Sequence, residues 1–209
     1  VRERARSHLL DALRVARRLG SRAAILSVTG TISHWLYQGG DFTRMIRWSD
    51  RMVRIGEREG RPSVVVQAHL DLGVVLVELD RFEQGEQHLR EALHVSRSLG
   101  MSQAVVHGLD TLRALLAAVG RFDEARAALE EARQLAGRIG FLSVSELDNS
   151  LAWIHFLEER DLQGAERIYR ACWDRARSDG QYAQIVRSWR GLVWTVLLRG
   201  RWEDAGVLL

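Results

Sequence analysis

Seven histidines, one cysteine and several pairs of adjacent acids are the side chains of this sequence best suited to catalysis or metal binding. The histidines show no H-E-x-x-H or paired-histidine spacing, and no C-x-x-C occurs, so the usual zinc-binding arrangements are missing. Adjacent acids such as Glu130-Glu131 point to different sides of a helix, which indicates a solvated face instead of a catalytic dyad. We therefore expect no catalytic residue, no metal site, no cofactor and no enzyme activity.

The composition favours a folded protein of the cytoplasm. Cys172 is the only cysteine, so no disulfide forms within the chain, and a packed core thiol explains it better than a reactive nucleophile. No run of about 18 uncharged apolar residues is present, so we expect no membrane span. All 30 basic residues are arginine, and they alternate with acids along most of the sequence. That alternation favours a solvated surface over a nucleic-acid interface.

An internal repeat organises the whole sequence. Glycine recurs every 40 residues, at Gly20, Gly60, Gly100, Gly140 and Gly180. A second series with the same spacing follows short polar turns, at Phe42, Phe82, Phe122, Leu162 and Trp202. Two series locked to one period indicate a repeat architecture, in which each unit buries its apolar face against its neighbours.

The segments between these marks have helical periodicity. Leu72, Val75, Leu76 and Leu79 are spaced to form one apolar stripe on a helix, which does not suit a strand. Pro62 suits a first helical turn, and Ser143 with Glu146 has the spacing of a capping box. The unit is therefore a helix, a tight turn, a second helix and a glycine cap. First helices are predicted at about 22–39, 62–79, 102–119, 142–159 and 182–199, and second helices at about 2–19, 42–59, 82–99, 122–139, 162–179 and 202–209.

This register predicts a single repeat domain over residues 1–209, cut from a longer protein. Residues 1–20 form the second helix of a preceding unit, and the following units cover about 22–60, 61–100, 101–140, 141–180 and, in part, 181–209. Neither end has the polar cap of a finished solenoid. We expect the unpaired first helix and the apolar Val207-Leu208-Leu209 end to promote end-to-end self-association.

These units resemble the tetratricopeptide repeat. The small residue midway along the first helix is present as Gly73, and the small residues of the second helix are Gly85, Ala125, Ala165 and Ala205, followed by Ala12, Ala92 and Ala132. The sequence departs from the pattern at Arg113, Trp153 and Val193, and its period of 40 exceeds the usual period of about 34. The resemblance implies an all-α, right-handed superhelical solenoid of antiparallel helix pairs, with about 11 helices. The long unit is similar to the sensor region of maltose-activator-like LuxR-type regulators and related signalling ATPases.

The resemblance also implies a ligand-binding inner face, formed by particular positions of each first helix. On this sequence those positions are His34, Tyr37, Gln67, His107, Asp110, Arg187, Arg190 and Trp194. Arginine can clamp a carboxylate or phosphate, and a neighbouring indole offers a surface for stacking. Trp189 and Trp202, in contrast, fall where the family has core aromatics.

The function expected is that of a sensor and interaction region within a larger bacterial signalling or transcription-regulating protein. Its partner would be a protein or peptide segment, with a small acidic or aromatic ligand as the other candidate. The alternative is a scaffold that docks peptide segments of partner proteins without switching.

Overall fold

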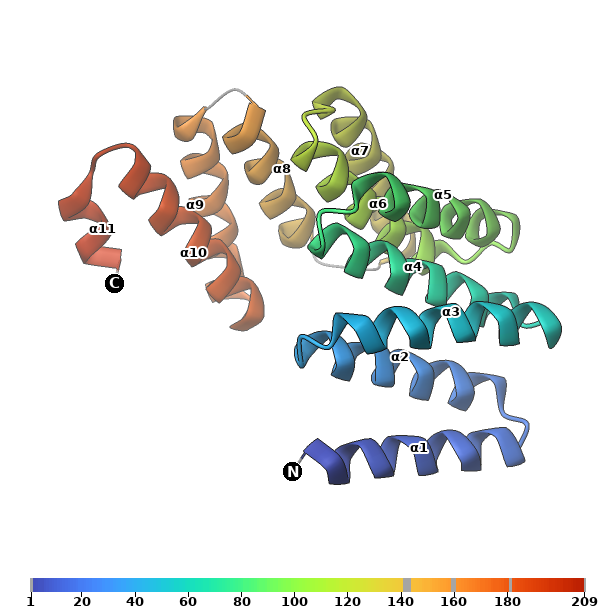
Figure 1. Cartoon of the computed structure of the whole chain (residues 1–209). Coiled ribbons are helices and arrows are strands. Elements are labelled where there is room, and N and C mark those ends of the chain that lie inside the picture. The colour runs from blue at the N-terminus through green and yellow to red at the C-terminus, as the bar shows by residue number, and fades with distance from the viewer. Residues whose placement is uncertain (1, 141–143, 159–160, 181, 209) are drawn as a thin grey trace. The chain divides into compact units, whose positions relative to one another are not determined.

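The computed structural model describes residues 2–140, 144–158, 161–180 and 182–208, and the described residues form eleven α-helices (Figure 1). Their bounds are α1 Arg2–Arg18, α2 Arg22–Gln38, α3 Phe42–Arg58, α4 Pro62–Glu78, α5 Phe82–Ser98, α6 Ser102–Ala118, α7 Phe122–Ile139, α8 Val144–Glu158, α9 Leu162–Ser178, α10 Tyr182–Leu198 and α11 Trp202–Leu208. Every predicted helix is present within about two residues of its predicted bounds, and the all-α prediction is confirmed.

The ends of the helices follow a spacing of 20 residues, half of the period seen in the sequence. The predicted glycine caps all adopt a positive φ, and so do the glycines at 40, 120 and 200. Asp80 takes the same place in its turn, with φ of 56°. Gly60 N–H donates to the carbonyl of Glu57 at 3.2 Å, and Arg61 N–H donates to the carbonyl of Gly56 at 2.7 Å. This left-handed closure stops one helix and fixes the direction in which the next one starts.

Side-chain caps and a proline begin several helices. The hydroxyl of Ser21 and the carboxylates of Asp41 and Asp161 each accept a hydrogen bond from a backbone N–H of the first helical turn. Pro62 is the first residue of α4, as predicted. The predicted capping box at Ser143 falls outside the described residues.

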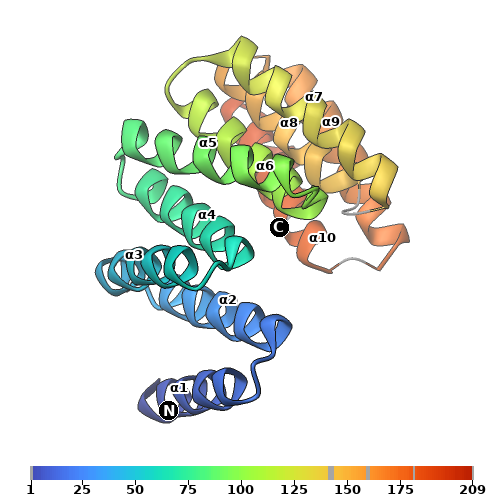
Figure 2. The ribbon, with the colours of Figure 1, turned by 90° about the vertical axis from the view of Figure 1, so that its right-hand side faces the viewer.

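The chain divides into two compact units, Val1–Gly108 and Leu109–Leu209. In the first unit, successive helices run antiparallel, and Figure 2 shows α3, α4 and α5 packed one on the next. The core joins α1 to α4, with Leu13 from α1, Ile32 and Leu36 from α2, Met45 from α3, and Leu72, Val75 and Leu76 from α4. The apolar stripe predicted on residues 72–79 therefore forms part of this core, except that Leu79 is 40% exposed.

The core of the second unit joins α8 to α11. Tyr169 lies at its centre with Ala152, Ala165, Leu192, Val196 and Ala205, and Cys172 is buried beside it, as a packed core thiol should be. The predicted core position of Trp202 is wrong, because its side chain is 69% exposed. The equivalent Phe42 is half-buried and packs against the core of the first unit, and Phe122 is half-buried as well.

A buried acid fastens α9 to the turn between α10 and α11. Glu166 is only 6% exposed, and it accepts hydrogen bonds from Arg170, Arg199 and Arg201. Burial alone would raise the pKa of Glu166, but the arginine hydrogen bonds and charges outweigh it and hold the pKa below its ordinary value. Breaking such a cluster leaves a buried charge without a partner, so we interpret it as a structural clamp.

A substitution of Gly73 would test how closely the two helices of one unit, α4 and α5, pack against each other. A β-carbon at this position would lie 2.5 Å from Cγ and Cδ2 of Leu89, which is fully buried on α5. We expect Gly73→Ala to lower the free energy of unfolding by about 1–3 kcal/mol, because α4 and α5 must move apart.

The matched control is Gly137→Ala, a helical position where an added β-carbon meets no atom within 4 Å. It should be neutral or should raise stability by about 0.5–1 kcal/mol, through helix propensity alone. Urea unfolding followed by circular dichroism measures both variants. Equal changes in the free energy of unfolding for Gly73→Ala and Gly137→Ala would contradict the close packing of α4 against α5.

Candidate binding surfaces

Two of the predicted inner-face residues, Tyr37 on α2 and Gln67 on α4, form side-chain hydrogen bonds within the first unit. The hydroxyl of Tyr37 donates to the carboxylate of Glu78 at 2.7 Å, and the ring of Tyr37 lies 6.0 Å from that of Phe42. Burial and the nearby carboxylate raise the pKa of Tyr37 to about 12. Tyr37 therefore links two first helices, and its hydroxyl is already engaged. His34, in contrast, is exposed on α2.

Gln67 is paired with an acid that the sequence had not singled out. Its amide donates to the carboxylate of Asp71 at 2.9 Å, one turn further along α4. Burial raises the pKa of Asp71 to about 6, against the opposing effect of the Gln67 hydrogen bond. The four-residue spacing was the signal that could have found Asp71. His107 lies exposed on α6.

In the second unit, the predicted residues Asp110 and Arg190 have different surroundings. The carboxylate of Asp110 accepts hydrogen bonds from Arg113 at 3.0 Å and from Ser150 at 3.1 Å. Arg113 is 7% exposed, so the pair satisfies a buried guanidinium that occupies the position of a small residue in the repeat pattern. Asp110 is thus held by its own neighbours, whereas the side chain of Arg190 is exposed.

Arg187, Arg190 and Trp194 lie together on α10. Their spacing of three and four residues places them on one side of the helix. Both arginines are exposed, and Trp194 is 60% exposed. Neither arginine forms an ion pair with any residue that the structure describes. Of the predicted set, these three form the surface best suited to contact a separate molecule.

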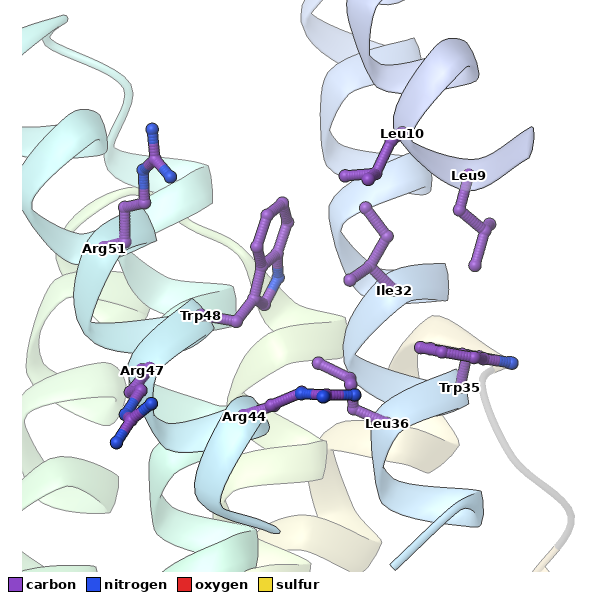
Figure 3. A pocket seen from close by; sticks show the side chains of 9 residues that line it. All are labelled: Leu9, Leu10, Ile32, Trp35, Leu36, Arg44, Arg47, Trp48 and Arg51. Carbon is purple, nitrogen blue, oxygen red and sulfur yellow. The ribbon is translucent and has the colours of Figure 1, made fainter. Parts of the chain in front are cut away.

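A second surface, which the sequence reasoning missed, is a groove between α1 and α3 in the first unit (Figure 3). It encloses a cavity of about 370 Å³, lined by Leu9 and Leu10 from α1, Ile32, Trp35 and Leu36 from α2, and Arg44, Arg47, Trp48 and Arg51 from α3. The indole of Trp48 projects from α3 toward Ile32 and Leu10 (Figure 3). A neighbouring cavity of about 410 Å³ shares Leu10, Trp48 and Arg51 and continues along α1 to Arg18. We call the two cavities together the α1–α3 groove.

The groove lies on the side of α2 opposite to the predicted inner face. With 3.6 residues per turn, Ile32 and Leu36 fall on one side of α2, and His34 and Tyr37 fall on the other. The signal that could have found the groove is a stripe of arginines on α3, spaced by three and four residues at Arg44, Arg47, Arg51, Arg54 and Arg58.

Several solved structures match this chain over all or nearly all of its length. BtubC (BKLC) from P. vanneervenii matches with a TM-score of 0.77 and 16% identity, over 100% of this chain and 88% of that one. The apo form of RapI matches with a TM-score of 0.71 and 15% identity, over 97% of this chain and 72% of that one. A signal transduction ATPase with numerous domains and a tetratricopeptide repeat sensor, from Pyrococcus horikoshii, matches at 0.66 and 16%, over 99% of this chain and 33% of that one.

The chain has the tetratricopeptide-like repeat fold. No family model matches the sequence, and no curated protein matches it either. At these identities the likeness establishes the fold, while the binding surfaces differ from one such protein to another. None of the described helices is long and apolar enough to cross a membrane.

Within this tetratricopeptide-like repeat, two histidines that lie far apart in the sequence come into contact. The Nδ1 atoms of His69 on α4 and His88 on α5 are 2.9 Å apart, which requires one ring to donate and the other to accept. Burial lowers the pKa of both rings, and the charge of His88 lowers that of His69 further. Among the described residues, no group of three or more histidine, cysteine, aspartate or glutamate side chains could hold a metal ion.

The histidine pair predicts a loss of stability in mild acid. An unfolded histidine has a pKa of about 6.5, and both folded pKa values lie lower, so the folded state favours the neutral rings. Their contribution is complete above about pH 6.5 and is lost as the pH falls below it, through the folded pKa values. We expect the urea midpoint to drop between about pH 7.5 and pH 5.5, and to drop less in His88→Gln.

His94→Gln on the same helix is the control, because it removes an exposed histidine and leaves the contact of His69 with His88 in place. Asp71 remains in every variant, so its opposite contribution, which decreases as the pH rises through about 6, cancels in the comparison. Identical pH dependence in His88→Gln and the wild type would show that the pair does not titrate with folding.

Proposed function

We propose that this chain is a sensor and interaction region of a larger bacterial signalling or transcription-regulating protein, and that it recognises an acidic segment of a partner protein. The observation that carries the proposal is the exposed α10 surface of Arg187, Arg190 and Trp194. An indole that is 60% exposed leaves a large apolar area in water, and two arginines beside it have no acid to neutralise them in the described structure.

The chemistry of the α10 surface suits a carboxylate next to an apolar or aromatic side chain. A guanidinium can donate two parallel hydrogen bonds to one carboxylate, with more geometric selectivity than a lysine ammonium. Tryptophan and arginine are also the residues that contribute most often to the energetic centres of protein interfaces. A small acidic or aromatic ligand is the other candidate for the same surface.

A regulatory role would follow from differential binding. A partner shifts a protein between two states only if it binds one of them more tightly. Repeats contact mainly their neighbours, so a small rotation in each unit changes the binding surface along its length. The similarity in fold to a signalling ATPase whose repeat region is named a sensor supports this role for the present chain.

The α10 surface is tested by Arg187→Ala together with Arg190→Ala. Peptides selected from a random displayed library by the wild-type chain should be enriched in acidic and aromatic residues. We expect the double variant to lose about tenfold or more in affinity for them, because interface arginines commonly contribute more than about 1 kcal/mol each. Fluorescence anisotropy measures the affinities.

The control for this test is Arg138→Ala together with Arg167→Ala, which removes the same charge from exposed positions of α7 and α9 in the same unit. Unchanged thermal unfolding of both double variants would show that binding, and not folding, is measured. Equal affinity of the α10 variant and the wild type would refute a role for this surface.

The regulatory part of the proposal is tested by reading the parent gene on both sides of this sequence. An upstream phosphate-binding loop and a downstream helix-turn-helix would support a transcription regulator. Further repeats alone would favour a scaffold that does not switch.

A further inference from the structure

The α1–α3 groove combines an apolar interior with a basic rim. Leu9, Ile32 and Leu36 line its interior, and Leu10, Trp35 and Trp48 are apolar side chains around it, of which Leu10 is 40% exposed. Its volume of about 370 Å³ is within the range of ligand sites, and a second cavity extends it along α1. An apolar interior of this kind is filled best by the apolar side chains of a partner, because their burial removes apolar surface from water.

The rim of the groove is basic on both walls. Arg44, Arg47 and Arg51 line the α3 wall, and Arg14, Arg17 and Arg18 line the α1 wall. Arg44 pairs with Asp41, the N-cap of α3, at 3.2 Å, and Arg14 pairs with Asp11 of α1 at 2.6 Å. In the described structure, Arg47 and Arg51 pair with no carboxylate. The charge of Asp50, their neighbour on α3, acts on the half-buried histidines His69 and His88.

The arginine stripe indicates the shape of the occupant. Arg44 to Arg58 follow one side of α3 at spacings of three and four residues, and cover about 21 Å at 1.5 Å per residue. An acid at the same spacing on a second helix would face the stripe along its length. Apolar side chains on the adjacent face of that second helix would then point into the groove.

We propose that the α1–α3 groove binds an acidic amphipathic helix of a partner protein. The apolar face of that helix enters between α1 and α3, and its carboxylates pair with Arg47 and Arg51. This inference rests on the proposed interaction function, but it places a second contact on the opposite side of α2 from the predicted inner face. A nucleic acid fits less well, because its phosphates would pair with the arginines and leave the apolar interior empty.

The probe is a fluorescein-labelled peptide of about 16 residues, or four helical turns, with leucine and phenylalanine at positions i, i+3, i+4 and i+7 and glutamate elsewhere. Its binding to the full chain is measured by fluorescence anisotropy. We expect Arg47→Glu together with Arg51→Glu to weaken binding by about tenfold or more, because the charges then repel the peptide. Binding to the wild type should also weaken several-fold between about 50 mM and 300 mM salt.

Three further variants separate binding from folding. Trp48→Phe should keep most of the affinity, since it preserves an apolar ring and removes only an indole N–H that is buried without a hydrogen-bond partner. Trp48→Ala should bind the peptide more weakly, because it removes part of the apolar wall of the groove. Arg138→Glu together with Arg167→Glu makes the same charge change on exposed positions of the second unit, and should bind the peptide nearly as the wild type does.

The indole N–H signals of the seven tryptophans locate the peptide directly. In a ¹⁵N-correlated NMR spectrum, assigned by single Trp→Phe variants, the peptide should shift the signals of Trp35 and Trp48. A shift of Trp194 alone, with binding lost in the Arg187→Ala and Arg190→Ala variant, would overturn the groove and leave the proposed function intact. If this peptide does not bind at all, the groove proposal fails, while library-selected peptides still decide the proposed function.

Two other occupants are distinguished by the same assay. If a single-stranded oligonucleotide displaces the peptide at an equal or lower concentration, the groove is a nucleic-acid site and the proposal is overturned. If light scattering shows a dimer that Arg47→Glu and Arg51→Glu abolish, the occupant is a second copy of this chain, which overturns the proposal as well.

Discussion

The left-handed closure found at residues 20, 40, 60, 80, 100, 120, 140, 180 and 200 is the constraint on which the rest of the structure depends. It fixes most helices at 17 residues, so that two successive helices have nearly the same length and end at the same level. Equal length keeps the apolar stripe of one helix opposite that of the next over the whole pair. A helix one turn longer would carry its last apolar residues past its partner and into water. At these positions glycine has no steric cost, and Asp80 shows that a short polar side chain can take its place.

Close packing between the helices follows from that closure. Where the two helices of a pair approach most closely, only a small side chain fits, as the contact of Gly73 with Leu89 shows. The same position on α6 is Arg113, and its buried guanidinium donates hydrogen bonds to Asp110. One position in the repeat thus has two physical solutions. In the first, Gly73 leaves room for the side chain of Leu89 on the neighbouring helix. In the second, the buried charge of Arg113 is neutralised by Asp110 on the same helix.

The fold could be predicted from the sequence because its determinants are local and periodic. Gly60 and Phe42 belong to series that recur every 40 residues, and each series indicates the same helix boundaries. The contact of His69 with His88 could not be predicted in this way. It depends on the rotation of two helices about their axes, which the spacing of 19 residues does not reveal. The core position expected for Trp202 is wrong, because its side chain is 69% exposed although the equivalent Phe42 and Phe122 are half-buried.

The candidate site was predictable only in part, because the sequence cannot show which charges satisfy each other. Asp110 and Arg187 were equivalent as polar residues of first helices, yet only Asp110 is held by neighbours in the described structure. The groove was missed because the resemblance directs attention to the inner face, and Trp48 and Arg51 lie on a second helix.

Arginine is the only long basic residue of this chain, so its surroundings decide what each one does. Arg199 and Arg201 both donate hydrogen bonds to the buried Glu166, and these ion pairs hold α9 to the α10–α11 turn. Arg47 and Arg51 stand beside an apolar cavity with no described carboxylate to pair with. An exposed ion pair on a helix adds at most about 1 kcal/mol, so an acid at a neighbouring position would add little to the stability of α3. Its presence would, however, neutralise the rim of the groove. Unpaired arginines around an apolar interior therefore fit a surface whose acid is supplied by another molecule.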